Sequence, residues 1–311
     1  MRVTRILRGL RHTKPLIDGE FEVKPHHPVP IQGPKPHYYW TKGYANYSGS
    51  FEGMPPVHDK YDIQRLRKAG RLAADTLQKG LESVKAGVTT EELDKIIHDF
   101  ILSKGGYPAP IYYMTFPKSV CTSVNESKSY TVVCHGVPNL RPLQEGDSIN
   151  LDVTVYIDDV YGDTSEMAVV GTPHPDVERL IAATREAVRE GIKVCRPGIK
   201  MKEVGAACEA VAEKHGFAVC HEFVGHGIGR HMHMPPPVYH TRNTIDFTMQ
   251  PGMVFTIEPI LIASAKYELE IWKDGWTVVD RHRNPSAQAE HMVLITENGC
   301  EVLTERGQVR Q

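Results

Sequence analysis

Five residues between Ile149 and Glu290 are of the types that bind divalent metal ions, and each lies in a short motif that suits a ligand. They are Asp152, Asp163, His226, Glu258 and Glu290. Four carboxylates balance the four positive charges of two divalent ions, and the imidazole adds a neutral ligand. One imidazole with four carboxylates suits Co, Mn, Fe or Zn, and the lack of thiolate argues against a structural zinc site. Any one of these acids alone is more often salt-bridged or solvated, but the five together predict a dinuclear metal centre.

The two aspartates are expected to face each other across a β-hairpin. Asp152 lies in the β-branched run INLDVTVYI and Asp163 in VYGDTS, with a polar Asp158-Asp159 turn between them. In an antiparallel pair closed by an even-length loop, their odd offset puts both side chains on one face, directly opposite or one diagonal step apart. At such a short distance, two carboxylates repel each other unless a cation lies between them.

The other three ligands are expected in strand-rich segments further along the chain. Glycines on both sides of His226 in HEFVGHGIGR let the backbone approach a ligand closely. Glu258 and Glu290 each lie within an apolar strand, MVFTIEPI and SAQAEHMVLIT. An acid in such a strand is costly to bury unless it is paired or binds a metal.

Three histidines outside this set have open roles on residue type alone. FPKSVCTSVNE and TVVCHGVP predict a hairpin that delivers His135 at a strand end, with the insertion SKSYT between them. A lone histidine is usually structural, but this one precedes Asp152 by only seventeen residues. The segment HMHM offers His231 and His233 on the same side of an expected extended strand.

Two helix pairs precede the strand-rich segments and indicate an internal repeat. IQRLRKAGRLAADTLQKGLESV has helical periodicity, and TTEELDKIIHDFILSKGG opens with a capping box from Thr89 to Glu92. The layout returns after residue 170, with Gly87 matching Gly198 and Gly105 matching Gly216 at one spacing of 111 residues. Such a duplication predicts two similar halves with a cleft between them.

Composition narrows the class of protein. The 311 residues are 41% hydrophobic, which is enough for a sizeable core, and a net charge of −2 gives no footprint for nucleic acid. No apolar run approaches the roughly 18 residues that span a bilayer. Six cysteines without a CxxC pair favour a reducing compartment, and Cys121 and Cys134 are expected to be small buried hydrophobes. MRVTRILRGLR, with four arginines, is interpreted as a basic terminus or as a mitochondrial presequence.

From about Pro108 onward, the motifs FPKSVCTSVNE, CHGVP, LDVT, GDTS, GHGIGR, FTIEP, DGWT and SAQAEH resemble those of type I methionine aminopeptidases. With the helix pairs, the resemblance covers roughly 250 residues. It implies an α+β pita-bread fold with two pseudo-symmetric halves, each a helix pair with antiparallel sheet. Residues 61–311 would form the catalytic domain, and the proline-rich residues 1–60 would form an N-terminal extension, an extended arm that either lies on the domain or leads to it.

The resemblance also implies roles. It assigns the metal ions to Asp152, Asp163, His226, Glu258 and Glu290, with Asp163 and Glu290 as bridging ligands. Glu258 would be the general base, His233 would stabilise the oxyanion, and His135 would bind substrate and relay protons. The spacing from His226 favours His233 over His231, which becomes a rim residue. A methionine pocket is implied for Tyr113, Phe116, Cys121, Met232 and Trp276, which on residue type alone would be ordinary core.

The resemblance implies removal of the initiator methionine from nascent polypeptides when the second residue is small. We expect a cytoplasmic monomer, possible ribosome contact, and no nucleic acid or membrane partner; a mitochondrial location is the alternative. An aminopeptidase P or prolidase would share the metal set, but CTSVNE, CHGVP and DGWT disfavour it. A non-catalytic protein of the same fold would be expected to lose ligands. Two departures from the family are the SKSYT insertion and Met232, which stands where an aromatic residue is usual.

Overall fold

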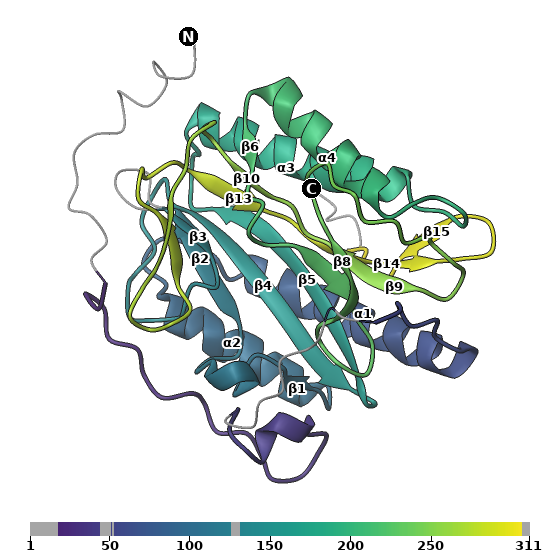
Figure 1. Ribbon diagram of the computed structural model, residues 1–311. Coiled ribbons are helices and arrows are strands. Elements are labelled where there is room, and N and C mark those ends of the chain that lie inside the picture. Colours follow the sequence, from purple (N-terminus) through teal and green to yellow (C-terminus); the bar gives the residue numbers. More distant parts are fainter. Residues whose placement is uncertain (1–17, 44–50, 52, 126–130, 307–311) are drawn as a thin grey trace.

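The computed structural model describes residues 18–43, 51, 53–125 and 131–306. In these ranges, two helix pairs pack on a central set of antiparallel strands. The first pair lies in the lower part of the view in Figure 1, and the second pair lies along its top. The long strands β4 (Ser148–Ile157) and β5 (Val160–Val169) run through the middle of the molecule. The α+β pita-bread expectation is therefore confirmed in outline.

The first helix pair begins where the sequence places it. α1 spans Lys60–Leu81, and its N-cap Asp59 accepts hydrogen bonds from Tyr61 N and Asp62 N. α2 spans Thr90–Ser103 and opens with the expected capping box, in which Thr89 and Glu92 satisfy each other's backbone amides. The apolar face of α1 packs against β4 and β5, which fixes these strands relative to the helices.

The second pair repeats the first. α3 spans Pro175–Lys193 and α4 spans Lys202–His215, and the two helices pack on each other and on the strands of the second half. Gly87 and Gly198, which precede α2 and α4, have φ of 87° and 85°. Gly105 and Gly216, which follow these helices, have φ of 76° and 74°. Because the left-handed conformation favours glycine, the matching values explain why glycine recurs at one spacing.

Within the described residues, the strands form four small sheets. β1 (Tyr107–Pro108), β2 (Cys121–Asn125) and β5 all pair with β4. The largest sheet has the order β15-β14-β9-β7-β8, from strands Cys300–Val302, His291–Ile295, Val254–Ile257, Gly225–Gly227 and Met234–Val238. A third sheet has the order β13-β10-β6, from Ser286–Gln288, Ile260–Ile262 and Ala218–Val219. A fourth has the order β11-β12-β3, from Leu269–Ile271, Val278–Asp280 and Val132–Cys134.

The hairpin expected around His135 is present in an irregular form, with its two arms joined by a bridge and a backbone hydrogen bond. β2 meets the segment of β3 at the antiparallel bridge between Asn125 and Thr131 and at the hydrogen bond from Thr122 N to Gly136 O. In addition, β2 pairs with β4, while β3 pairs with β12 in another sheet. The buried side chains of β3 pack with Ile260 and Ile262 in an apolar cluster of the other sheets. His135 still follows the strand directly, as expected. Most of the SKSYT insertion lies outside the described residues.

The described part of the N-terminal extension lies along the first half, beside α2 and β1 (Figure 1). Leu140 N donates to Glu22 O, and the ring of His98 lies 3.2 Å from Pro28 O. Within residues 18–43, the chain forms one short 3-10 turn, His37–Tyr39, and is otherwise irregular. The boundary at residue 60 remains a prediction, and the arginine-rich residues 1–11 lie outside the described ranges. Among described helices, none is both long and apolar enough to cross a bilayer.

Candidate metal centre and active site

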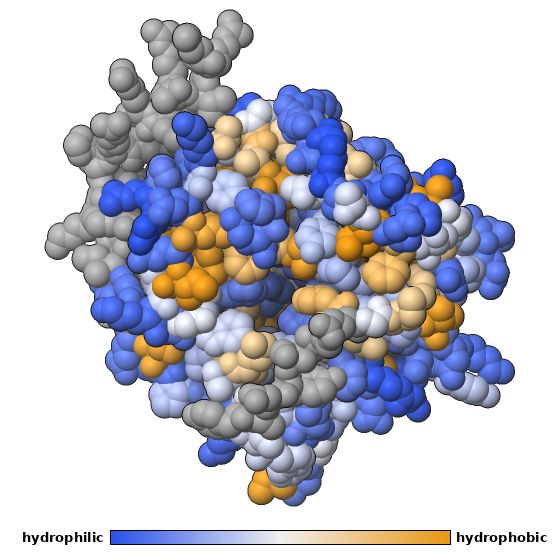
Figure 2. All heavy atoms as spheres, viewed as in Figure 1, coloured by the Kyte–Doolittle hydropathy of each residue, from blue (hydrophilic) through white to orange (hydrophobic). Residues whose placement is uncertain are grey.

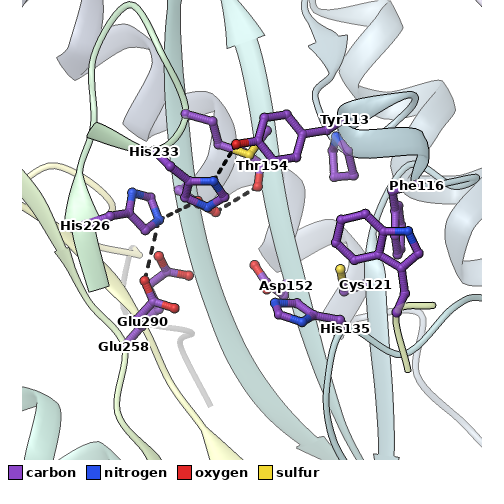
Figure 3. A pocket seen from close by; sticks show the side chains of 14 residues that line it. Tyr113, Phe116, Cys121, His135, Asp152, Thr154, His226, His233, Glu258 and Glu290 are labelled. Carbon is purple, nitrogen blue, oxygen red and sulfur yellow. Dashed lines mark hydrogen bonds and ion pairs between the residues drawn. The ribbon is translucent and has the colours of Figure 1, made fainter. Parts of the chain in front are cut away.

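One pocket brings together all the site residues that the sequence analysis names. Figure 2 shows a hollow near the middle of the face that Figure 1 presents, and Figure 3 shows the pocket from close by. Two further residues, Pro110 and Thr154, also line it. The lining residues named from the sequence are Asp152, Asp163, His226, Glu258, Glu290, His135, His233, Tyr113, Phe116, Cys121, Met232 and Trp276.

The aspartate pair lies on one face of a regular hairpin, as predicted. A two-residue turn, Asp158-Asp159, joins β4 to β5, and both turn residues have positive φ. Asp163 is directly opposite Thr154, so Asp152 lies one diagonal step from it. Thr154 Oγ1 donates to Asp163 Oδ1 over 2.9 Å, which holds the carboxylate in place.

The two glutamates lie at breaks between strands rather than within them, which corrects the sequence interpretation. Glu258 follows β9 and precedes β10, while Glu290 lies between β13 and β14. β9 pairs with β14, but β10 pairs with β13 in another sheet. Both segments therefore change sheets at their acid. At such a break the backbone alternation of a strand no longer fixes the side-chain direction, which allows both carboxylates to reach the pocket.

His226 presents one ring nitrogen to the acids. It lies on β7, where a Cβ on Gly225 would lie 2.5 Å from Thr256 O, so glycine allows the strands to approach. Its Nδ1 lies 3.1 Å from Gly227 O and can donate to it, which leaves Nε2 as the ligand atom. Nε2 lies 3.7 Å from Asp163 Oδ2 and 3.5 Å from Glu258 Oε1.

The electrostatics of the site fit a divalent cation. Burial raises the pKa of Asp152 to about 7, and burial followed by the nearby Asp152 carboxyl raises the pKa of Asp163 well above its usual value. Burial is also the main cause of the raised pKa values of Glu258 and Glu290. Burial lowers the pKa of His226 to about 4, so its ring is neutral. Asp163, His226 and Glu290 offer ligand atoms within 4.8 Å of one another, and positive charge there would relieve the crowding of the acids.

Two histidines flank the acids on different sides (Figure 3). His233 lies with its ring 4.3 Å from that of His226, and its Nδ1 lies 2.6 Å from the Tyr113 hydroxyl. His135 lies on the side of Asp152 with its ring near Trp276, and burial lowers its pKa to about 4. His231 is not among the lining residues.

The prediction that His231 and His233 lie on an extended strand is wrong. Both residues lie in a bend before β8, where Gly229 N donates to His231 O. The bend separates the two side chains, so only His233 lines the pocket.

An apolar wall closes the side of the pocket opposite His226. The rings of Phe116 and Trp276 meet edge to face with centroids 5.1 Å apart. Cys121 lies opposite Asp152 in the pairing of β2 with β4. Burial, then the nearby acids, raises the pKa of the Cys121 thiol well above its usual value, which keeps it a neutral, weakly polar group. Met232, 6% exposed, completes the lining.

Sequence reasoning missed the residues that hydrogen-bond to the candidate ligands. Thr256 Oγ1 donates to Glu258 Oε1 over 2.7 Å, and Gln288 Nε2 donates to Glu258 Oε2 over 3.3 Å. Glu258 N donates to His240 Nε2 over 3.0 Å. Thr154 and Thr256 each lie two positions from a ligand, so strand alternation offered a signal for these two. Nothing in the local sequence points to His240.

The fold and the site together define a metallopeptidase of the pita-bread class. The profile of metallopeptidase family M24 matches residues 64–297. Methionine aminopeptidase 1D, chloroplastic/mitochondrial, from Arabidopsis thaliana is 40% identical over 308 residues, which covers 97% of this chain and 85% of that protein. Methionine aminopeptidase from Salmonella typhimurium is 47% identical over 248 residues, covering 79% of this chain and 92% of that protein.

Solved structures agree with the sequence comparisons. Methionine aminopeptidase from Rickettsia prowazekii superimposes with a TM-score of 0.77 at 44% identity, covering 81% of this chain and all of that chain. A prolidase from Pyrococcus furiosus reaches a TM-score of 0.64 at 20% identity, which shows the shared fold alone. The chain belongs to metallopeptidase family M24 and, within it, to the methionine aminopeptidases. It is therefore a hydrolase that uses divalent metal, and the prolidase and non-catalytic alternatives are disfavoured.

Proposed function

We propose that this chain removes the N-terminal methionine from polypeptides whose second residue is small, by dinuclear metal-assisted hydrolysis. The observation that carries the proposal is that five residues of metal-binding types and an apolar wall line one pocket. The aminopeptidase activity is supported by relatives at 40% and 47% identity that carry this name.

The donor set favours two divalent ions among Co, Mn, Fe and Zn. Asp152, Asp163, His226, Glu258 and Glu290 would hold them, with Asp163 and Glu290 as bridges. Cys121 also lines the pocket, but its raised pKa disfavours a thiolate ligand. When bound, the ions would hold the free amino terminus, polarise the scissile carbonyl and make hydroxide available near neutral pH.

The side chains of the pocket divide the remaining chemistry. Glu258 accepts the proton of the water that adds to the carbonyl carbon, and passes it to the leaving amine as the C–N bond breaks. His233 donates a hydrogen bond to the oxyanion as it forms. His135 lies on the opposite side, where it can hydrogen-bond the substrate.

The apolar wall selects the side chain that is removed. Tyr113, Phe116, Cys121, Met232 and Trp276 offer aromatic edges and sulfur atoms, which suit the unbranched thioether of methionine. A small second residue is expected because the pocket lies deep between the two halves, where a bulky neighbour would meet the walls.

Turnover of a Met-Ala-Ser peptide tests this function. The protein is stripped of metal and reconstituted with one metal at a time, and we expect activity only after reconstitution. Met-Leu-Ser should be cleaved far more slowly, and Ala-Pro-Ser should remain intact. Cleavage of Ala-Pro-Ser but not Met-Ala-Ser would replace the proposal with a prolidase-like activity.

The partners and the compartment belong to the same proposal. Nascent polypeptides would be the substrates, with possible ribosome contact, and the enzyme would act as a monomer. The names of the relatives 1D from Arabidopsis thaliana and Homo sapiens favour the mitochondrial alternative over the cytoplasmic expectation. Fusion of residues 1–60 to a fluorescent reporter tests this, because a reporter that remains in the cytosol would contradict mitochondrial import.

A further inference from the structure

A tyrosine of the N-terminal extension is built into the wall of the pocket. Tyr38 is 2% exposed, and its hydroxyl donates to Ala109 O over 2.5 Å. Its ring meets that of Tyr113, which lines the pocket, at 5.3 Å and 78°. Tyr38 thus gives the extension a buried aromatic contact with a side chain of the active site, beside the more exposed ring of Phe51, whose centroid lies 6.4 Å from that of His233.

Tyr113 contacts one of the two ring nitrogens of His233. The Tyr113 hydroxyl lies 2.6 Å from His233 Nδ1 (Figure 3). In a neutral imidazole one nitrogen donates and the other accepts. When the hydroxyl donates to Nδ1, the hydrogen of His233 is on Nε2 and is free to be donated to a developing oxyanion. The opposite arrangement would leave Nε2 as an acceptor, which cannot stabilise an oxyanion.

The loop that carries Tyr113 has an unusual backbone. Tyr112, Met114 and Thr115 have φ of 66°, 46° and 73°, in the left-handed region that non-glycine residues rarely adopt. Such a conformation persists only where the surroundings hold it. The position of Tyr113 therefore depends on what packs against residues 112–115.

The extension supplies much of that packing. A Cβ on Gly43 would lie 2.2 Å from Tyr112 O and 2.5 Å from Thr115 N, so the extension rests directly on the loop backbone. The Tyr112 hydroxyl lies 2.6 Å from His26 Nε2. With Tyr38 bound to Ala109 O, residues 26, 38 and 43 contact the loop and the segment before it.

We infer that Tyr38 is a positioning residue for methionine hydrolysis: it holds Tyr113 where the tyrosine hydroxyl fixes His233 with its hydrogen on Nε2. The inference rests on the proposed function, because it assigns His233 to the oxyanion. Tyr38 itself touches neither the substrate nor the metal ligands in this scheme. Its effect passes through the hydrogen bond between Tyr113 and His233.

A double-mutant cycle on kcat tests this chain of contacts. With Met-Ala-Ser and saturating metal, Tyr38→Ala and Tyr113→Phe should each lower kcat by about tenfold, with little change in KM or metal content. The double variant should be no slower than Tyr113→Phe, because the contact through which Tyr38 acts is already lost. If the double variant lost kcat by the product of the two single losses, the inference would be overturned. Tyr38→Phe keeps the ring and should lower kcat by only about threefold. If Tyr38→Ala does not fold, the cycle is run with Tyr38→Phe in its place.

The matched control and a second measurement separate this inference from the proposed function. Trp40→Ala alters a neighbouring residue that is 69% exposed and should leave kcat unchanged. The ¹⁵N chemical shifts of the His233 ring report the tautomer in the resting protein without any activity. We expect hydrogen on Nε2 in the unaltered protein and a mixture of tautomers in Tyr38→Phe and Tyr113→Phe. The same tautomer in all three would overturn the inference even if the protein cleaves Met-Ala-Ser. Failure of the unaltered protein to cleave Met-Ala-Ser would overturn the proposed function and with it the role in hydrolysis, whereas the tautomer measurement would still decide whether Tyr38 holds Tyr113 against His233.

Discussion

The two halves of the fold share a framework but deliver their metal-binding side chains in different ways. Gly80 in α1 lets Ile97 and Leu151 approach, and Gly191 in α3, at the same spacing of 111 residues, does so for Cys208 and Ile257. The turns also match, because Gly87 N donates to Leu143 O and Gly198 N donates to Met249 O. The duplication therefore extends to helix contacts and backbone hydrogen bonds.

The strands differ between the halves. The first half places Asp152 and Asp163 on one hairpin of two ten-residue strands. The second half collects His226, Glu258 and Glu290 from short strands and from breaks where the chain passes between sheets. A regular hairpin fixes side-chain direction locally, whereas a site built from strand breaks depends on long-range pairing. The two halves should therefore respond differently to substitution.

The largest effect is expected from the ligands, one from each half. Asp152→Asn keeps the volume but removes a negative charge, and Glu258→Gln removes a ligand together with the general base. Each should lower kcat/KM by roughly a thousandfold with the fold retained. Excess metal should restore part of the activity of Asp152→Asn but not of Glu258→Gln, as measured by turnover and metal content. Near-normal turnover of Asp152→Asn at low metal would show that Asp152 is not a ligand.

The next effect concerns the bend in the second half. His233→Ala should lower kcat by roughly a hundredfold, with metal content intact and a smaller change in KM, because one donor to the oxyanion is lost. His231→Ala should be nearly silent, since His231 does not line the pocket. The kcat and KM of both variants with Met-Ala-Ser test this prediction. The reverse outcome would place the oxyanion beside His231.

Sequence predicts the regular parts of this molecule well. The hairpin of Asp152 and Asp163 follows from strand alternation and an even-length turn, and the capping box at Thr89 follows from residue types alone. The glycine spacing of 111 residues predicts the repeat because left-handed turns favour glycine at both places. These features depend on neighbours within one element.

The irregular parts depend on contacts that local patterns do not encode. An apolar run around Glu290 is expected as one strand, but its first part, β13, pairs with β10 and its second part, β14, pairs with β9, so the strand is broken in two at the acid. The bend at His233 and the hydrogen bond from Glu258 N to His240 likewise arise from distant partners. The five proposed ligand residues were assigned because their motifs resemble a family, and their mutual geometry could not be worked out from the sequence.

Metal removal should have a moderate effect on stability that depends on pH. Bound Mn or Co should stabilise the fold by about 2.7 kcal/mol at a hundredfold excess over Kd, raising Tm by roughly 5 °C, and a chelator should reverse the shift. In the metal-free protein, burial raises the pKa of Asp152 to about 7 from 3.8. The unfolded chain thus loses this proton at lower pH than the folded chain, so metal-free stability should fall as pH rises from about 4 to 7. With metal bound, the carboxylates stay ionised and this fall should disappear.

Calorimetry of both forms across that pH range measures the difference. A metal-free protein whose Tm rises between pH 4 and 7 would contradict the raised pKa. Absence of any shift with metal or chelator would argue against a preformed site that joins the two halves.

The smallest effect tests the equivalence of the halves directly. Gly87 and Gly198 have φ of 87° and 85°, and a Cβ on either would meet no atom within 4 Å. Alanine at each position should therefore lower the free energy of unfolding only by the strain of the left-handed conformation, about 1 kcal/mol. The two losses should agree within about 0.5 kcal/mol. Gly299→Ala is the matched control, because its surroundings are equally open but its φ is not positive. It should be neutral or slightly stabilising. Denaturant unfolding measures all three free energies, and a large loss at only one of the two equivalent glycines would mean that the framework is shared in shape but not in energetics.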